Sequence, residues 1–425
     1  MKERNYLYPK LIFILLILQF ETTFTSYAQK PQTIRIAPEA ARGGQVSDIF
    51  DSVSFIPLES TKESEFGEIN QLIVTDKYYI ILDNRTTNCI LIFNKDGKFQ
   101  TKISDWKGHA PNFLSNKPYI SDGKWINYIS YDSQNHIIEV KLYQNKDSTT
   151  YEFDLNGKLI KKIKKTWGES DQWLNLKNNE RIHLHSISKT YFKDKTIDAF
   201  NQIDIINHDS TINSFWPIDT AYPLIYNYSG QNYMANYGLT FYKDTVALLS
   251  FPGSYDVYEV TPNAIKKRYK FIFPENLYLP DSLRSIKAFS KYKIYKHPHI
   301  FSTKTIQVGN LLFIRAFDVR ENDTYIYNLL NGSITNFSKI EPDKTSHFLK
   351  ICDASEGGVN YSNKGFYLSD GKSIYTAYPG KYLSQQFGEE IAKSIKNNTP
   401  LKKFFASPKK YRNYVIVKLT PKSQN

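Results

Sequence analysis

Histidine is the residue type whose spacing comes nearest to a metal-binding pattern in this chain. His183 and His185 lie two residues apart, as do His297 and His299. On a β-strand this spacing points both rings to one face of the sheet, as a bound metal would require. No third ligand can be assigned from the sequence, and strands facing solvent or a channel often carry histidine without metal. We therefore predict neither a metal site nor a cofactor.

Three common sequence motifs of catalytic sites are absent. The chain has no Gly-x-Ser-x-Gly turn, no glycine-rich phosphate loop and no His-Glu-x-x-His helix. Its two cysteines, Cys89 and Cys352, fit neither a metal-binding nor a redox spacing, so two buried thiols or one disulfide are the alternatives. The missing motifs favour a non-catalytic role and leave the question of enzymatic activity open.

Tryptophan offers a different chemistry, because an exposed indole ring can stack on the face of a sugar. Several of the five tryptophans lie in or near polar segments between expected strands: Trp106, Trp125, Trp167, Trp173 and Trp216. Aromatic residues make up 15% of the chain, and most of them must be in the core. The tryptophans motivate a glycan-binding hypothesis, with ordinary packing as the alternative.

The segment from Tyr78 to Ile103 shows which element positions such residues. It contains three β-rich runs, Tyr78–Leu82, Cys89–Phe93 and Phe99–Ile103, and the last two are joined by Asn94–Gly97. Asp-Gly between two β-rich runs predicts a tight hairpin, because glycine supplies the positive φ that the turn requires. The unit is a β-meander.

The same pattern recurs along the chain and predicts a closed ring of repeats. The second residues of the turns are Gly97, Gly157, Asp209, Asn263, Gly332 and Gly380. Six such units predict an all-β, six-bladed β-propeller. Seven blades are the alternative, because one unit can be split between the termini. We expect Val415–Leu419 to pair with Val53–Pro57 and close the ring.

Two segments depart from the β pattern. Asp281–Tyr292 and Ser384–Lys396 carry apolar residues at helical spacing. Both predict short helices inserted into loops of the propeller. Such insertions would either cap a ligand site on one rim or cover blade edges, and the sequence leaves both alternatives open.

Four segments of the first repeat carry a family resemblance: Phe55–Glu59, Gly67–Ile69, Ile81–Asp83 and Ile92–Phe99. With them the chain resembles the exported six-bladed β-propeller proteins of Bacteroidetes. The first blade is the specific part of the likeness, and later blades match only in their turn pattern. The resemblance implies the fold and export rather than a particular activity.

Members of that family follow the first blade with a loop of the form Gly-x-Gly-Pro-Gly-Glu-Tyr. The corresponding segment here, Lys107–Phe113, keeps Gly108, Pro111 and the final aromatic residue but lacks two glycines and the glutamate. We predict that this loop keeps its backbone course and lines the ligand rim. Trp106 would then stack on the ligand, and His109 would change charge near neutral pH. Packing of Trp106 between blades is the alternative.

The first residues have the layout of a secretory signal. Basic residues precede the apolar run Leu11–Leu18, and a polar stretch ends at Ser26 and Ala28. This run is shorter than the roughly 20 residues that a bilayer span needs, so we expect no transmembrane anchor. We predict a signal peptide over residues 1–28, cleavage near Ala28, and a single propeller over residues 29–425 in the periplasm or outside the cell.

The formal net charge of +13 invites a nucleic-acid partner. We exclude it because the protein is expected to be exported and because AT-rich codons explain the excess of lysine. The sequence predicts a monomeric, non-catalytic binding or scaffolding propeller that recognises a glycan, a peptide or a cell-envelope protein at one rim. The alternative is a glycan-active hydrolase or lyase with its site at the central channel, and a purely structural role is the third reading.

Overall fold

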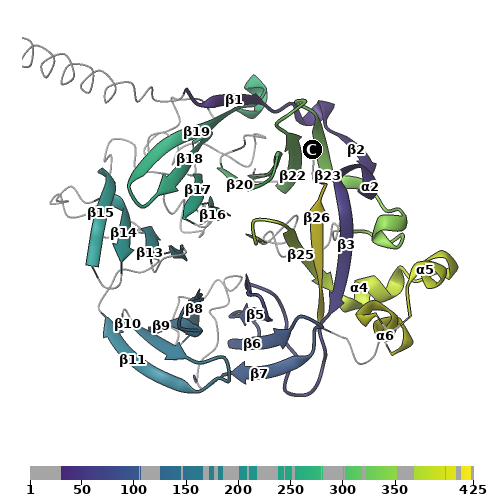
Figure 1. Cartoon of the computed structure of the whole chain (residues 1–425), viewed down its shortest axis with the longest axis horizontal. Coiled ribbons are helices and arrows are strands. Elements are labelled where there is room, and N and C mark those ends of the chain that lie inside the picture. Colours follow the sequence, from purple (N-terminus) through teal and green to yellow (C-terminus); the bar gives the residue numbers. More distant parts are fainter. Residues whose placement is uncertain are drawn as a thin grey trace, which may run out of the picture.

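The computed structural model describes residues 30–104, 106, 125–144, 147–165, 172–176, 180–184, 201–207, 210–217, 238–243, 245–250, 254–278, 280, 300, 302–317, 322–351, 368–397, 399–407 and 413–422. Their strands form six sheets that stand as blades around a ring (Figure 1). The predicted six-bladed β-propeller is confirmed. The predicted signal peptide lies outside the described residues.

The first three blades are consecutive antiparallel sheets of four strands. Blade 1 contains β4 (Gln71–Val74), β5 (Tyr78–Asp83), β6 (Cys89–Asn94) and β7 (Phe99–Ile103). Blade 2 contains β8 (Trp125–Asp132), β9 (Ile137–Gln144), β10 (Asp147–Phe153) and β11 (Leu159–Lys165). Blade 3 contains β12 (Gln172–Asn175), β13 (Glu180–Leu184), β14 (Asn201–Asn207) and β15 (Ser210–Pro217).

Blades 4 and 5 also contain four consecutive strands, whereas blade 6 joins strands from both ends of the chain. Blade 4 contains β16 (Gly238–Lys243), β17 (Val246–Ser250), β18 (Asp256–Thr261) and β19 (Ala264–Ile272). Blade 5 contains β20 (Ser302–Val308), β21 (Leu311–Phe317), β22 (Asn322–Asn328) and β23 (Ile334–Glu341). Blade 6 contains β24 (Leu368–Ser369), β25 (Ile374–Pro379), β26 (Tyr414–Pro421) and β3 (Phe50–Pro57).

The core lies between neighbouring blades, because each blade buries both of its faces. In blade 1, Ile81 and Leu91 pack with blade 6, whereas Ile80 and Ile92 pack with blade 2. Successive residues of a strand point to opposite faces of the sheet, so a strand that is buried on both faces needs an unbroken apolar run. This is why β5 and β6 are apolar at nearly every position.

The two ends of the chain close the ring in blade 6. Strand β26 pairs antiparallel with β3, and Val415 lies opposite Pro57 while Leu419 lies opposite Val53. These are the two segments that the sequence analysis paired, so the predicted closure is confirmed. Val415, Val417 and Leu419 of β26 are fully buried in the core shared with blade 5.

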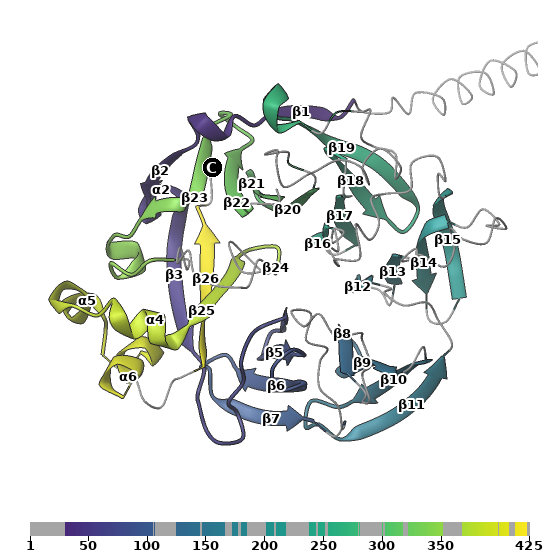
Figure 2. The same cartoon turned by 180° about the vertical axis from the view of Figure 1, so that it is seen from behind.

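The N-terminal segment runs along the outside of two blades, as Figures 1 and 2 show. Strand β1 (Gln32–Arg35) pairs parallel with β19 of blade 4, and β2 (Arg42–Gln45) pairs parallel with β23 of blade 5. Each becomes the fifth strand of its sheet. The sequence analysis did not predict these strands, because parallel pairing between distant segments leaves no hairpin signal in the sequence.

The hairpin turns of the blades follow the predicted pattern except in blade 6. Gly97, Gly157 and Gly332 have positive φ angles of 78°, 81° and 72°. Pro262 and Asn263 also join the third and fourth strands of a blade, and His208-Asp209 lies outside the described residues, between the antiparallel strands β14 and β15.

The turn predicted at Pro379–Gly380 is wrong, because the helix α4 begins at Gly380. The physical reason is the way in which the two ends of the chain close the ring in blade 6. The fourth strand of blade 6 comes from β3, so β25 leads into a helical insertion rather than into the last hairpin of the blade.

Short helices fill the insertion between β25 and β26. They are α4 (Gly380–Gln385), α5 (Glu389–Ser394) and α6 (Pro400–Ala406), so the helix predicted over Ser384–Lys396 is present but broken at Gln386–Gly388. Ile391 and Ile395 are buried in the core of blades 5 and 6, and the helices lie outside blade 6 (Figure 1). The insertion therefore covers a blade edge.

The remaining short elements are α2 (Val46–Ile49) and the 3₁₀ turns η1 (Pro38–Ala40), η3 (Glu275–Leu277) and η6 (Lys344–Ser346). The helix predicted over Asp281–Tyr292 lies outside the described residues. Within the described part of the chain, no helix is long and apolar enough to cross a membrane.

Candidate functional site: a pocket between blades 4 and 5

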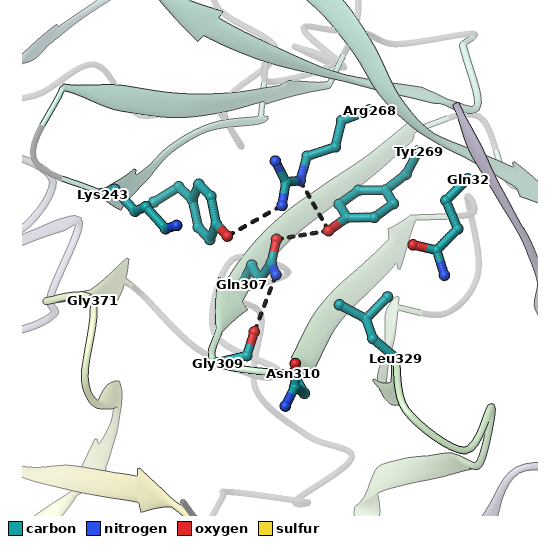
Figure 3. A pocket seen from close by; sticks show the side chains of 10 residues that line it. Gln32, Lys243, Arg268, Tyr269, Gln307, Gly309, Asn310, Leu329 and Gly371 are labelled. Carbon is teal, nitrogen blue, oxygen red and sulfur yellow. Dashed lines mark hydrogen bonds between the residues drawn. The ribbon is translucent and has the colours of Figure 1, made fainter. Parts of the chain in front are cut away.

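A pocket of about 460 Å³ lies where blades 4 and 5 meet (Figure 3). It is on the end of the ring that carries the turns at Asn94–Gly97 and Gly309–Asn310, here called the hairpin rim. Four parts of the chain line it, from the N-terminal strand to blade 6: Gln32, Tyr242, Lys243, Arg268, Tyr269, Gln307, Gly309, Asn310, Leu329 and Gly371. A pocket of this volume lies in the range that small-molecule ligands occupy.

Arg268, in the middle of β19, is the most tightly held charged group of the pocket. Its Nε donates to the Tyr269 hydroxyl at 2.9 Å, and its Nη2 donates to the Tyr242 hydroxyl at 3.1 Å. Its Nη1 is bonded to a carboxylate oxygen of Glu259. The guanidinium carbon also lies 4.8 Å from the centre of the Tyr242 ring. With three neighbours bonded to it, the planar guanidinium has one orientation.

A chain of hydrogen bonds continues from Arg268 across the boundary between the blades. The Tyr269 hydroxyl donates to Oε1 of Gln307 at 2.8 Å, and Nε2 of Gln307 donates to the Gly309 carbonyl at 3.1 Å (Figure 3). Burial raises the pKa of Tyr269, which keeps its hydroxyl protonated as the donor of this bond. Gln32 lies directly beside Tyr269 because the two residues are paired in the parallel strands β1 and β19. Arg268, Tyr269 and Gln307 are thus held in place before any ligand arrives.

Positive charge prevails in this part of blade 4. Glu259 is buried behind Arg268, and Lys266 Nζ lies 2.9 Å from its other carboxylate oxygen. Burial alone would raise the pKa of Glu259, but the hydrogen bond from Lys266 and the charge of Arg268 outweigh it, so the pKa lies below its usual value. Two cations, Lys266 and Arg268, therefore share the single ionised carboxylate of Glu259.

The described residues of the lining include no Asp, Glu, His or Cys. No group of three or more His, Cys, Asp or Glu side chains that could hold a metal occurs in the described part of the chain. The pocket instead presents cations, amides and backbone groups.

Trp106, one of the two predicted ligand residues, is packed in the core between blades 1 and 2. It is only 8% exposed, its Nε1 donates to the Asn88 carbonyl at 2.8 Å, and its ring centre lies 5.6 Å from that of Phe153. It follows the end of β7 and so lies at the end of the ring opposite the hairpin rim. The ligand role of Trp106 stays a prediction. His109, the other predicted residue, lies outside the described residues.

The histidines and cysteines of the sequence analysis do not meet at a site within the described residues. His183 is buried in β13, and His185, His297 and His299 lie outside the described part of the chain. Cys89 is a buried thiol that forms no disulfide, and burial raises its pKa. Cys352 is outside the described residues.

Sequence reasoning missed the pocket because its residues are spread from Gln32 to Gly371. The available signal was weak. Tyr242–Lys243 and Arg268–Tyr269 are two aromatic–cationic pairs in the same repeat, at the end of its first strand and within its fourth. Nothing in the sequence says that the two pairs face each other.

Comparisons with known proteins agree with this fold. The model of a family described as 6-bladed beta-propeller matches residues 29–353. A solved structure described as "Putative exported protein" from Bacteroides fragilis is 14% identical, covers 92% of this chain and 100% of its own, and has a TM-score of 0.61. The Dos1 propeller is 9% identical over 83% of this chain and 90% of its own, with a TM-score of 0.33. No curated protein sequence matches the chain.

Proposed function

Because the chain belongs to the six-bladed β-propeller family, we propose that it is an exported, non-catalytic binding module whose site is the pocket between blades 4 and 5. The observation that carries this proposal is the lining, which offers fixed donors and cations without a carboxylate or imidazole among its described residues. The fold alone would not suffice, since one fold hosts many functions.

The preorganised lining supports a binding role in a second way. Arg268, Tyr269 and Gln307 are already locked to one another by hydrogen bonds at 2.8 and 2.9 Å. A ligand that enters such a site does not have to order these side chains, so less of the interaction free energy is lost on binding. The ligand classes are those that the sequence suggested: a glycan, a peptide or a cell-envelope protein.

Export is part of the proposal and rests on the signal layout over residues 1–28. Cleavage near Ala28 leaves Gln29 as the first residue, one position before the described part of the chain begins. Mass spectrometry of the protein recovered from the periplasm or medium checks this, and an intact Met1 terminus would contradict it.

The experiment for binding is a thermal-shift screen of glycans and peptides, followed by calorimetry with the binders. Lys243→Gln and Asn310→Ala remove two groups of the lining, and Lys267→Gln is the matched control. Lys267 precedes Arg268, lies outside the lining and pairs with Asp256 at 2.7 Å. We expect a loss of about tenfold or more in affinity, roughly 1.4 kcal/mol, in the first two variants only. Binders with equal affinity for all four proteins would place the site elsewhere.

A further inference from the structure

We infer that the ligand of this pocket is an acidic saccharide, with a carboxylate that lies between Lys243 and Arg268. The inference rests on the proposed function, since it names the ligand class of the same site. Three observations lead to it: the local charge, the fixed guanidinium and the kind of neutral group that completes the lining.

Among the described residues, the neighbours of the site do not balance its positive charge. The carboxylate of Glu259 is shared by Arg268 and Lys266, so one negative charge serves two cations. Lys267, next along the strand, has Asp256 as its partner. Lys243 forms no ion pair with a described residue, and its ammonium lies 5.1 Å from the centre of the Tyr242 ring. A ligand carboxylate would supply the missing negative charge.

The guanidinium of Arg268 is oriented for such a ligand. Arginine has five N–H donors, and the bonds to Tyr269, Tyr242 and Glu259 use three of them. The remaining donors belong to a group that cannot rotate away, and charge-assisted bonds from guanidinium to carboxylate are among the strong ones in proteins. A neutral ligand would instead desolvate Lys243 without supplying an opposite charge, which is unfavourable.

The neutral part of the lining favours a sugar over a peptide as the carrier of the carboxylate. Gln32 and Asn310 provide amides, each of which can both donate and accept hydrogen bonds. A sugar hydroxyl also does both, so amides and hydroxyls satisfy each other. Leu329 is the one aliphatic side chain among the described lining residues, and the other apolar surface includes the rings of Tyr242 and Tyr269, which can also pack on the face of a sugar.

The test compares a glucuronate-containing disaccharide with its neutral glucose counterpart by calorimetry. The wild-type protein should bind the acidic disaccharide about tenfold more tightly than the neutral one. Lys243→Gln should abolish this preference, and added salt should weaken it because it screens charges. Lys267→Gln should keep the preference. Arg268→Gln should also lose it, and Lys243→Gln keeps the test informative if loss of Arg268 unfolds blade 4.

Each remaining outcome overturns a distinct statement. Equal affinities for the acidic and neutral disaccharides, both reduced by Asn310→Ala, would refute the acidic ligand and leave the proposed binding site intact. Binding of an acidic peptide that depends on Lys243, without binding of either disaccharide, would refute the saccharide and keep the site. Binding that none of the pocket variants alters would refute the proposed site itself. If neither disaccharide binds the wild-type protein at millimolar concentration, the inference is wrong.

Discussion

Single polar side chains join neighbouring blades through the backbone at four boundaries, from blade 1 to blade 5. These side chains bond backbone carbonyls across the boundary: Gln71 to Ile129 at 2.6 Å, Asn175 to Tyr131 at 2.9 Å, Asn213 to Pro262 at 2.8 Å and Thr240 to Thr305 at 2.6 Å. The apolar faces between blades are not directional, so these bonds help to set how one blade sits on the next.

Substitutions of Trp106 can distinguish the two roles that the sequence analysis left open, ligand binding and packing between blades. Because the ring is buried and packs on Phe153, Trp106→Ala should lower the free energy of unfolding by about 3 to 5 kcal/mol. Trp106→Phe keeps most of the packing and loses the bond to Asn88, so it should cost about 1 kcal/mol. Urea unfolding measures both. A small loss in the alanine variant, with weakened ligand binding, would support the ligand role instead.

Because of Lys95, the free energy of unfolding should depend on pH in the alkaline range. Burial, followed by the charge of Lys418, lowers its pKa to about 8, although Asp370 and Asp76 act in the opposite direction. Between pH 8 and 10 the unfolded chain therefore binds more protons at this residue than the folded protein, so its contribution to stability rises with pH. Lys95→Met should remove this rise, measured by chemical denaturation at several pH values.

The matched control for Lys95→Met is Lys98→Met. Lys98 is an exposed lysine of the same turn, so its removal changes the net charge equally. If the difference in unfolding free energy between the wild-type protein and Lys95→Met stays constant from pH 8 to 10, the lowered pKa of Lys95 is contradicted.

At the level of elements, the hairpin of blade 1 also holds the end of β3. The Gly97 carbonyl accepts a hydrogen bond from the Glu59 backbone amide at 2.9 Å, and a carboxylate oxygen of Glu59 accepts from the Phe99 amide at 3.1 Å. The Asn94–Gly97 turn, which the sequence analysis identified only as a hairpin, thus also takes part in the contact between blades 1 and 6.

Gly97 and Gly332 both have positive φ angles, so their alanine variants can separate the cost of a strained backbone from the cost of disturbing the contact with β3. A Cβ on Gly97 would lie 2.2 Å from the Pro57 carbonyl oxygen, whereas one on Gly332 would lie 3.5 Å from the Tyr327 hydroxyl, an ordinary contact. Both alanine variants incur the cost of a left-handed backbone, about 1 to 2 kcal/mol. Gly97→Ala should lose clearly more stability than Gly332→Ala in denaturant titrations. Equal losses would show that the turn does not press on β3.

The outer edges of the blades are covered in different ways. Strands β1 and β2 cover blades 4 and 5, whereas β11 is the outermost strand of blade 2 and carries exposed Lys161 and Lys162 beside Leu159 and Ile160. Lysines on an edge strand oppose pairing with another chain, because a second strand would have to bury their charges. In this ring, added strands thus protect the edges of blades 4 and 5, and lysine charges protect the edge of blade 2.

For the whole molecule, the closure of the ring in blade 6 should decide its stability. Ile416 is fully buried in the core shared with blade 1, and Lys418, two residues on, is partly exposed. Ile416→Ala should cost about 2 to 5 kcal/mol, and Lys418→Ala far less. Deleting residues 414–425 should open the ring and leave an unpaired edge on β3, seen as aggregation in light scattering. A truncated protein as stable as the full chain would contradict the closure.

The sequence by itself determined the repeat, favoured six blades over seven and indicated the strands that close the ring, because hairpin turns and apolar runs are local signals. Asp-Gly and Asn-Gly turns fix hairpins, and unbroken apolar runs such as Ile80–Leu82 mark strands buried on both faces. Only the tertiary structure decided the rest. The parallel strands β1 and β2, the packing of Trp106 and the pocket around Arg268 depend on which faces meet across blades. Residues 200 or more apart in the chain, such as Gln32 and Tyr269, carry no mark of their contact, since side-chain packing and hydrogen bonds between blades form only once the ring has closed.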